Sequence, residues 1–209
     1  MDIETLDQIA QRHQTDKATI FTRTYAKAKG YAPHYDKLFS HLRDKPVKIL
    51  EIGVGGGESI RMWMDYFYMG HTEVFGVDVA INTNIWNTEG DAIDRYTFVH
   101  GDQSSEEFWE KFLNACGTEW DIIIDDGSHV SKDIITTFRK LWPALKSGGL
   151  YAIEDLNTSY GGKGSHFTPD GCPTQMEWIK SHLDTMNQVE TASIDWLHFS
   201  RELVVMCRK

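Results

Sequence analysis

The stretch LEIGVGGGES, residues Leu50–Ser59, decides the fold that we expect for this chain. It begins as an apolar strand, turns through glycines and enters a helix that starts near Glu58 or Ser59. The acid and the glycines at the end of the strand are Glu51, Gly53, Gly55 and Gly57. Glycines let the backbone turn tightly and approach a ligand, and the free N–H groups of the helix start face the same ligand. Such a turn alone is a weak signal, because it serves NAD, FAD, nucleotides or no ligand at all.

Short apolar runs alternate with amphipathic segments outward from this turn. Five runs are typical of strands: Val47–Gly53, Glu73–Val79, Tyr96–Asp102, Trp120–Asp126 and Gly149–Asp155. Helix-like segments separate or follow them: ESIRMWMDYF, SEEFWEKFLNAC, SKDIITTFRKLWPAL and TQMEWIKSHLDTM. Two further strand candidates, near Val189–Ile194 and Leu203–Cys207, are close enough to pair as a hairpin. The pattern predicts an α/β fold with a doubly wound, seven-stranded, Rossmann-like sheet, mostly parallel with an antiparallel last strand.

The length of 209 residues fits a single domain, 1–209. We expect a helical N-terminal cap segment at 1–45, a cofactor-binding core at 46–155, a substrate or lid loop at 156–173, and a C-terminal helix and hairpin at 174–209. In the cap segment, TDKA (Thr15–Ala18) predicts a helix start with Thr15 or Asp16 as its N-cap. The side chains that either pack on the domain or cover a pocket are His13, Tyr25, Tyr31, His34 and Tyr35.

The composition argues against several classes of protein. Lysine and arginine number 21 against 31 aspartates and glutamates, a formal charge of −10, and an acidic chain repels nucleic acid. The start MDIETLDQIA has no apolar core and is not a signal peptide, and no window approaches the roughly 18 apolar residues of a membrane span. The cysteines, Cys116, Cys172 and Cys207, suit reduced thiols. We expect a cytoplasmic protein without nucleic-acid or membrane partners, and a homo-oligomer stays open.

Polar residues at the next two strand ends turn the glycine-rich stretch into a candidate nucleotide slot. Asp78 ends the second strand about twenty residues after the turn, where dinucleotide folds bind ribose hydroxyls. HGDQS closes the third strand with Asp102 and Gln103. The turn lacks the Gly-Lys-Ser/Thr of a P-loop, and Glu58 stands where a dinucleotide GxGxxG turn has Gly or Ala, which disfavours a nicotinamide-dependent oxidoreductase. The alternative is that Asp78 and Asp102 merely cap turns.

Two pairs of carboxylates end the fourth and fifth strands. Asp125 and Asp126 close DIIIDDGSH, and Glu154 and Asp155 close GLYAIED. Neighbouring strands lie roughly 5 Å apart, so the pairs would meet at one edge of the sheet, where open parallel sheets bind ligands. Four carboxylates there would destabilise the fold unless a cation neutralised them. Mg²⁺ suits such oxygen ligands, with Mn²⁺ or Ca²⁺ as substitutes.

His129 lies three residues beyond Asp126, in the loop that leaves the fourth strand. A neutral imidazole there could take a proton from a hydroxyl whose pKa a divalent ion has lowered. The alternative is that Asp125 contacts the cofactor or supports the structure, Ser128 caps the next helix and His129 is a surface loop residue.

These motifs resemble a class I S-adenosylmethionine-dependent methyltransferase: ExGxGxG, an acid after the second strand and GDxS after the third. The resemblance implies that the Gly53–Gly57 backbone holds the methionine part of the cofactor, Asp78 the ribose hydroxyls, and Asp102 with Gln103 the adenine edge. It also implies that the first, fourth and fifth strands are adjacent. The further candidate cofactor contacts are Glu51, Ser59 and Asp125.

A narrower resemblance covers about Thr15 to Tyr160. GGESIRMW, GDQS, IIIDDGSH and GGLYAIEDLNTSY, in this order, are similar to the metal-dependent, mycinamicin-type sugar O-methyltransferases of macrolide biosynthesis, in which TDK also recurs. The resemblance implies Asp126, Glu154 and Asp155 as metal ligands and His129 as the general base. Those enzymes carry a large additional N-terminal domain that we do not find in this sequence.

We therefore expect an S-adenosylmethionine-dependent, Mg²⁺-assisted O-methyltransferase that acts on a sugar hydroxyl of a glycosylated natural product or a polysaccharide, with His129 and Asp126 as catalytic residues. A catechol or phenol O-methyltransferase of the same fold and a non-catalytic cofactor-binding module remain alternatives. Tyr160, Lys163 and His166 are candidates for substrate contact or simply loop surface.

Overall fold

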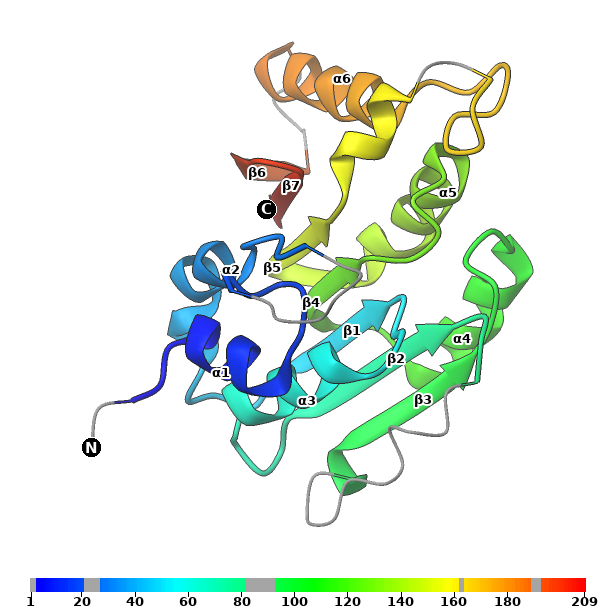
Figure 1. The fold of residues 1–209 in the computed structure, drawn as a ribbon. Coiled ribbons are helices and arrows are strands. Elements are labelled where there is room, and N and C mark those ends of the chain that lie inside the picture. Colours follow the sequence, from blue (N-terminus) through cyan, green and yellow to red (C-terminus); the bar gives the residue numbers. More distant parts are fainter. Residues whose placement is uncertain (1–2, 21–26, 82–92, 162–163, 189–192) are drawn as a thin grey trace.

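The structure, a computed structural model, describes residues 3–20, 27–81, 93–161, 164–188 and 193–209. Its seven-stranded sheet has the order β3-β2-β1-β4-β5-β7-β6 (Figure 1). The strands are β1 Lys48–Ile52, β2 Glu73–Asp78, β3 Tyr96–His100, β4 Trp120–Asp125, β5 Leu145–Ile153, β6 Ile194–Ser200 and β7 Leu203–Arg208. β7 pairs antiparallel with both β5 and β6, and the remaining pairs are parallel. The predicted sheet is confirmed, including its antiparallel last strand and the adjacency of β1, β4 and β5.

Helices cover both faces of the sheet. They are α1 Leu6–His13, α2 Ala32–Phe39, α3 Glu58–Tyr66, α4 Glu106–Cys116, α5 Ser131–Leu141 and α6 Gln175–Gln188. The 3₁₀ segments are η1 Ser40–Leu42, η3 Ile93–Arg95, η4 Trp142–Ala144 and η5 Leu156–Tyr160. α1, α2 and α3 lie on one face, and α4, α5 and α6 lie on the other (Figure 1). This arrangement is the doubly wound architecture that the strand–helix alternation predicted.

Two hydrophobic cores explain why the strands are apolar without interruption. Alternate strand residues point to opposite faces: Ile49 and Ile122 join the core under α1–α3, whereas Leu50 and Ile123 join the core under α4–α6. Because both faces are covered, both sets of side chains are buried. Trp63 is fully buried in the first core, where its ring packs edge-on against Tyr35 and stacks on Phe67.

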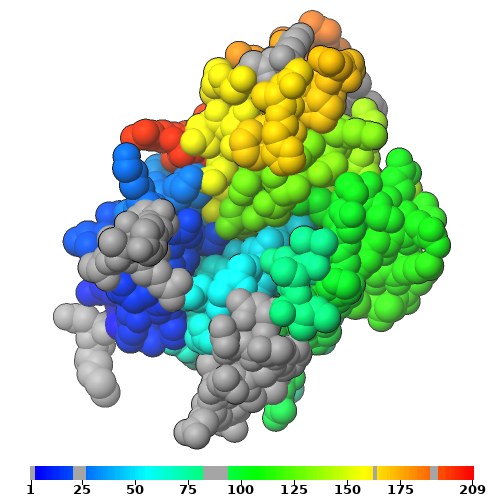
Figure 2. Space-filling view, turned by 45° about the vertical axis from the view of Figure 1, so that its right-hand side comes forward, coloured from blue at the N-terminus to red at the C-terminus, as the bar shows by residue number. Residues whose placement is uncertain are grey.

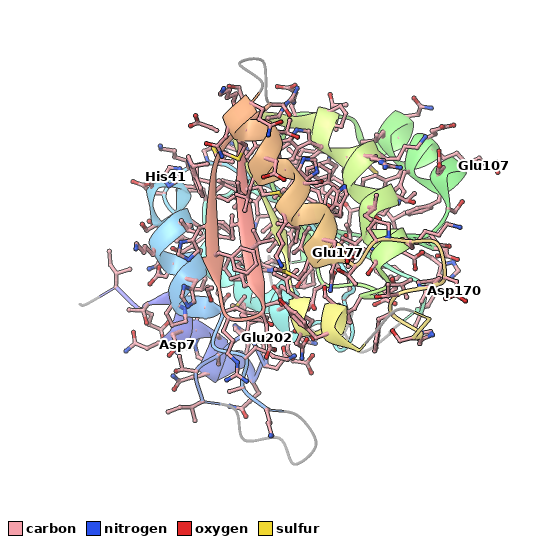
Figure 3. The ribbon with its side chains drawn as sticks, turned by 90° about the horizontal axis from the view of Figure 1, so that it is seen from above. Asp7, His41, Glu107, Asp170, Glu177 and Glu202 are labelled. Atoms are coloured by element: carbon pink, nitrogen blue, oxygen red, sulfur yellow. The ribbon has the colours of Figure 1, made fainter. Side chains whose placement is uncertain are left out.

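The last strand pair differs from the prediction in position. We expected a strand near Val189–Ile194, but β6 begins at Ile194, and residues 189–192 lie outside the described part of the chain. A tight turn at 201–202 pairs Ser200 with Leu203, and this pair fixes the register between β6 and β7. Viewed from above, the hairpin lies between α2 and α6 with Glu202 at its turn (Figure 3).

The predicted helix start at Thr15–Ala18 is wrong. α1 ends at His13, because Gln14 adopts a left-handed conformation with φ of 55°, and the following residues form turns. The helix begins at Leu6 instead, after the N-cap Thr5, whose side chain and that of Gln8 form a reciprocal capping box. Asp7 then accepts hydrogen bonds from the backbone N–H and the hydroxyl of Thr19, which fix the turn segment against α1.

The glycine-rich segment after β5 packs on the domain where it is described. Phe167 accepts a hydrogen bond from the backbone N–H of Ser131 at 2.8 Å, and Ser159 and Thr168 are buried. Its expected role as a lid or substrate loop stays a prediction, as does the division of the chain into functional segments. In the described ranges, the helices are too short or too polar to cross a membrane. All three cysteines are free thiols.

Gly53 is required by close backbone packing between the ends of β1 and β4. Its φ is 85°, and a Cβ there would lie 2.0 Å from the carbonyl oxygen of Asp126. Gly55 also has a positive φ, 52°, but a Cβ there would meet nothing within 4 Å. The two glycines therefore separate a steric requirement from a conformational one.

We expect Gly53→Ala to lower the free energy of unfolding by about 2 kcal/mol or more, because the methyl group forces β1 and β4 apart as well as straining the backbone. The matched control Gly55→Ala carries only the left-handed backbone cost of about 1 kcal/mol. Urea unfolding without cofactor measures both. Equal losses for the two variants would contradict the steric role of Gly53.

Candidate functional site

Two neighbouring cavities lie at the carboxyl ends of the parallel strands. The larger, of about 550 Å³, is lined by Gln14, Thr15, Asp16, Lys17, Gly53, Val54, Gly55, Gly56, Glu58, Ser59, Asp78, Asp126, Gly127, His129 and Asp155. The smaller, of about 200 Å³, is lined by Ile52, Gly53, Val77, Asp78, Val79, Gly101, Asp102, Gln103, Gly127 and Ser128. Figure 2 shows the blue N-terminal segment, the cyan segment and the green segments meeting on this face. The larger cavity is of the size that small-molecule ligands occupy.

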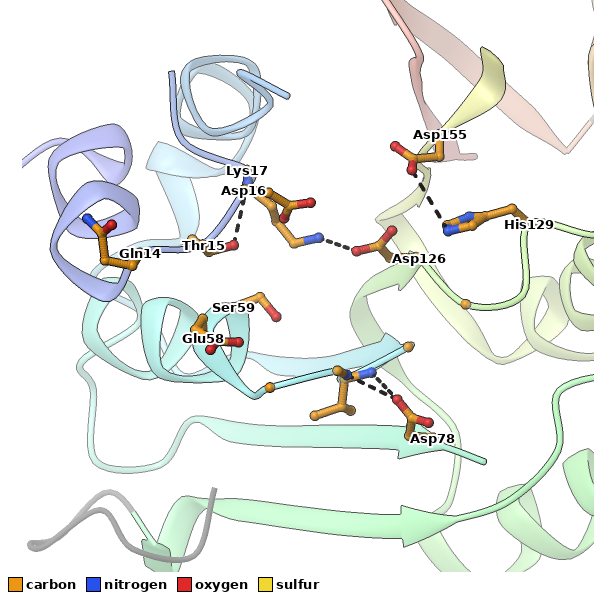
Figure 4. Close-up of a pocket in the computed structure, with 15 residues that line it drawn as sticks. Gln14, Thr15, Asp16, Lys17, Glu58, Ser59, Asp78, Asp126, His129 and Asp155 are labelled. Atoms are coloured by element: carbon orange, nitrogen blue, oxygen red, sulfur yellow. Dashed lines mark hydrogen bonds and ion pairs between the residues drawn. The ribbon is translucent and has the colours of Figure 1, made fainter. Parts of the chain in front are cut away.

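Asp78 shapes the glycine-rich turn as well as facing both cavities. One of its carboxylate oxygens accepts hydrogen bonds from the backbone N–H groups of Val54 at 2.8 Å and Gly55 at 3.0 Å (Figure 4). The other accepts from the N–H of Ala80 at 2.8 Å. The residue that the sequence assigned to a ribose therefore also holds the turn on which a cofactor would lie.

Glu51 is an interior residue, although the sequence suggested a cofactor contact. It is fully buried and accepts hydrogen bonds from the Ser59 hydroxyl at 2.8 Å and the Trp63 indole at 3.2 Å. Burial raises the pKa of Glu51 to about 7 despite a nearby ammonium group. Ser59 lines the larger cavity, whereas Glu51 does not and contacts the start of α3 through its hydrogen bond with Ser59.

Gln103 and Asp125 tie the smaller cavity to the end of β4. The Gln103 amide donates to Asp125 at 3.0 Å, and its carbonyl oxygen accepts from the N–H of Ser128 at 2.6 Å. Asp125 is buried, which raises its pKa to about 6, and it lines neither cavity. Asp102 lines the smaller cavity and is exposed. The two residues assigned to the adenine edge, Asp102 and Gln103, thus line the smaller cavity, whereas Asp125 lines neither cavity.

Lys17 is the central residue that sequence reasoning missed. Its ammonium lies 2.6 Å from an oxygen of Asp126, 2.7 Å from one of Glu154 and 3.3 Å from one of Glu51. Only 1% of Lys17 is exposed, and although burial works to lower its pKa, the three carboxylates raise that pKa well above the usual value. We expected a metal to neutralise these acids, but the structure places a lysine among them. In the sequence, TDK indicates only a motif shared with related enzymes.

Three more donors from the N-terminal segment meet the acids after β5. The Tyr35 hydroxyl donates to Glu154 at 2.6 Å, and the Tyr31 hydroxyl and the Lys29 ammonium each donate to the same oxygen of Asp155 at 2.7 Å. Burial raises the pKa of Glu154 well above its usual value. For Asp155 the hydrogen bonds from Lys29 and Tyr31 outweigh burial, so its pKa is lowered.

The other aromatic and histidine candidates of this segment lie elsewhere. His13 Nε2 lies 2.6 Å from Asp65 Oδ2, and His34 Nδ1 lies 3.2 Å from His198 Nε2. Tyr25 falls outside the described residues. Tyr31 and Tyr35 therefore carry the contribution of this group to the site, as buried donors rather than as a cover.

Asp126, His129 and Asp155 come together as a group that could hold a metal ion. Each offers a ligand atom, and these atoms lie within 4.8 Å of one another; no other such group of three occurs in the part of the chain that is described. His129 Nε2 lies 3.8 Å from Asp155 Oδ2, and His129 Nδ1 is buried without a hydrogen-bond partner (Figure 4). Carboxylate oxygens beside an imidazole fit a hard divalent ion. Glu154 is adjacent but bound to Lys17 and Tyr35.

The remaining candidates lie at the periphery. Ser128 donates to Asp133 at 2.8 Å and thus ties the loop to the first turn of α5, but it does not cap this helix, whose N-cap is Val130 without a side-chain cap. Tyr160 and His166 are exposed and line neither cavity. Lys163 lies outside the described residues.

A comparison with family models matches residues 50–156 to the family described as "Methyltransferase domain". The match begins in β1, includes the glycine-rich turn and ends after Asp155.

The chain belongs to the methyltransferase domain family.

Curated O-methyltransferases are similar to this chain along most of its length. The chain is 35% identical over 182 residues to mycinamicin VI 2''-O-methyltransferase of Micromonospora griseorubida, covering 83% of this chain and 43% of that protein. It is 36% identical over 199 residues to 8-demethyl-8-alpha-L-rhamnosyl tetracenomycin-C 2'-O-methyltransferase of Streptomyces olivaceus, covering 92% and 48%. The chain thus spans about half the length of the curated relatives it matches.

The methyltransferase fold extends to a solved relative. The structure of the MycE methyltransferase in complex with Mg, SAH and mycinamycin VI matches with a TM-score of 0.79 and 30% identity, covering 98% of this chain and 54% of that one. The resemblance stated from the motifs is therefore confirmed at the level of family and fold.

Asp78→Ala should lower the free energy of unfolding by about 1–3 kcal/mol even without cofactor, because three backbone N–H groups lose their acceptor. The control Asp102→Ala removes an exposed carboxylate that accepts from the N–H of Ser104, and should cost less than about 0.5 kcal/mol. Thermal unfolding of both variants distinguishes them. If Asp78→Ala were as stable as its control, the structural role of this carboxylate would be wrong.

Proposed function

We propose that this methyltransferase domain transfers a methyl group from S-adenosylmethionine to a sugar hydroxyl, assisted by a divalent ion, in the cytoplasm. One observation carries the proposal: the glycine-rich turn and the group of Asp126, His129 and Asp155 line the same cavity. A cofactor bound on the turn would therefore lie next to an ion bound on the group. The names of the relatives, all sugar O-methyltransferases, support the choice of acceptor.

Each partner of the reaction has residues to hold it. The turn that leads into α3 lines the larger cavity with Gly53, Val54, Gly55 and Gly56, and Asp78 and Asp102 line the two cavities where ribose and adenine would lie. Asp126 and Asp155 would hold the ion, with Glu154 as the third candidate ligand beside them. When bound, S-adenosylmethionine supplies an activated methyl group and the ion supplies positive charge beside the acceptor hydroxyl.

His129 would serve as the general base. As the new C–O bond forms and the C–S bond breaks, the hydroxyl proton must leave, and Nε2 of His129 faces the cavity next to Asp155. The backbone of His129 has a φ of 56°, an uncommon conformation that histidine tolerates better than most residues. In the proposed reaction His129 takes the proton while Oδ2 of Asp155 lies 3.8 Å from its Nε2.

The function is tested by incubating the protein with labelled S-adenosylmethionine, Mg²⁺ and parallel panels of glycosides and catechols. We expect label in a glycoside, loss of transfer with EDTA and recovery with added Mg²⁺. Label only in catechols would support the phenolic alternative. Cofactor binding without any transfer, unchanged by EDTA, would support a non-catalytic module and contradict the proposal.

His129→Asn should lower the rate of methyl transfer by about 10²–10⁴-fold, because the proton acceptor is lost while asparagine tolerates the same backbone conformation. Calorimetry should show unchanged affinity for S-adenosylhomocysteine. His41→Asn, which alters an exposed histidine of η1 that lines neither cavity, is the control and should keep full activity. Near-normal turnover of His129→Asn would rule out the base assignment.

A further inference from the structure

Asp126 and Asp155, the two aspartates of the candidate metal group, each have one carboxylate oxygen paired with a lysine of the N-terminal segment. Lys17 lies 2.6 Å from Oδ2 of Asp126, and Lys29 lies 2.7 Å from Oδ1 of Asp155. The hydroxyl of Tyr31 donates to the same oxygen of Asp155. The carboxylates are therefore engaged on one side before any ion arrives.

The remaining oxygens face the candidate metal group. Oδ2 of Asp155 is the atom that lies 3.8 Å from His129 Nε2, and the second oxygen of Asp126 points away from Lys17 (Figure 4). Glu154 already accepts a hydrogen bond on each of its oxygens, from Lys17 and from Tyr35. An ion held by Asp126 and Asp155 would therefore find one oxygen of each carboxylate already paired with a lysine.

The two lysines are held firmly in these positions. The carbonyl of Lys17 accepts from the N–H of Ala32 at 2.8 Å, and the N–H of Lys29 donates to the carbonyl of Asp16 at 2.7 Å. Lys17 is almost fully buried, and Lys29 is 23% exposed in its side chain. These hydrogen bonds hold the backbone of both lysines next to the two aspartates.

Divalent ions differ in what they demand of carboxylates. Ca²⁺ takes about 6–8 oxygens and commonly uses carboxylates in bidentate fashion, whereas Mg²⁺ takes about six in octahedral geometry and retains several waters. We propose that Lys17 and Lys29 are specificity-determining residues: by keeping Asp126 and Asp155 monodentate, they make the site select a small octahedral ion over Ca²⁺. The proposal rests on the proposed function, since it takes a divalent ion at this site as given.

The proposal is tested by the ratio of the affinity for Ca²⁺ to the affinity for Mg²⁺. A single affinity would not suffice, because removing a lysine strengthens the electrostatic attraction for every divalent ion alike. We would titrate Mg²⁺, Mn²⁺ and Ca²⁺ separately into the wild-type protein and the variants Lys17→Met and Lys29→Met by calorimetry. Lys17→Met frees Oδ2 of Asp126 from its ammonium, and Lys29→Met leaves Oδ1 of Asp155 with the Tyr31 hydroxyl alone. We expect the affinity for Ca²⁺ relative to Mg²⁺ to rise about tenfold in Lys17→Met and in the same direction in Lys29→Met.

Lys146→Met is the matched control, because Lys146 pairs with Asp121 at 2.7 Å at the opposite end of β4 and should leave the ratio unchanged. If Lys17→Met does not fold, Lys29→Met decides, since its lysine is partly exposed. A variant that folds and binds all three ions more tightly but with the wild-type ratio overturns the inference alone. A wild-type protein that binds none of the ions contradicts the metal-assisted function itself.

Discussion

The structure depends on one buried ammonium group, that of Lys17, which meets carboxylates from three adjacent strand ends. Each carboxylate lies at or next to the carboxyl end of a strand: Glu51 in β1, Asp126 after β4 and Glu154 after β5. Each would be costly to bury without a partner. Removing one partner of a buried ionic cluster costs about 3–5 kcal/mol. The carboxyl edge of the central sheet is therefore stable only with the N-terminal segment folded onto it, so fold and site share the same contacts.

Several residues at this edge have two tasks. Asp78 holds the glycine-rich turn by three backbone hydrogen bonds and also faces the cavities, and Gln103 links the β3 loop to Asp125 and Ser128. Gly53 lets β1 approach the backbone of Asp126. A site made of such residues is formed before ligands bind, which lowers the ordering cost of binding.

The sheet and half of the site could be predicted because their signals are local. The glycine-rich turn, the apolar strand runs and the acids at strand ends fix the sheet and bring Asp126, His129 and Asp155 together. Lys17 could not be predicted, because its partners lie 109 and 137 residues away and a lysine in a polar segment carries no signal of burial. The helix start at Thr15 failed for the same reason: long-range ion pairs, not local capping, set this segment. The start of β6 could not be predicted, because it depends on the pairing of β6 with β7 across the turn, and strand propensities carry no information on that pairing.

The most direct test of the proposed metal-assisted site is the anomalous scattering of Mn²⁺ in crystals grown with S-adenosylhomocysteine. The proposal expects one anomalous peak within coordination distance of a single oxygen each of Asp126 and Asp155, with Lys17 still bound to the other oxygen of Asp126. Crystals without a peak at these two aspartates, with Lys17 in place among its carboxylates, would show that the lysine alone neutralises the rim and would contradict a metal-assisted site.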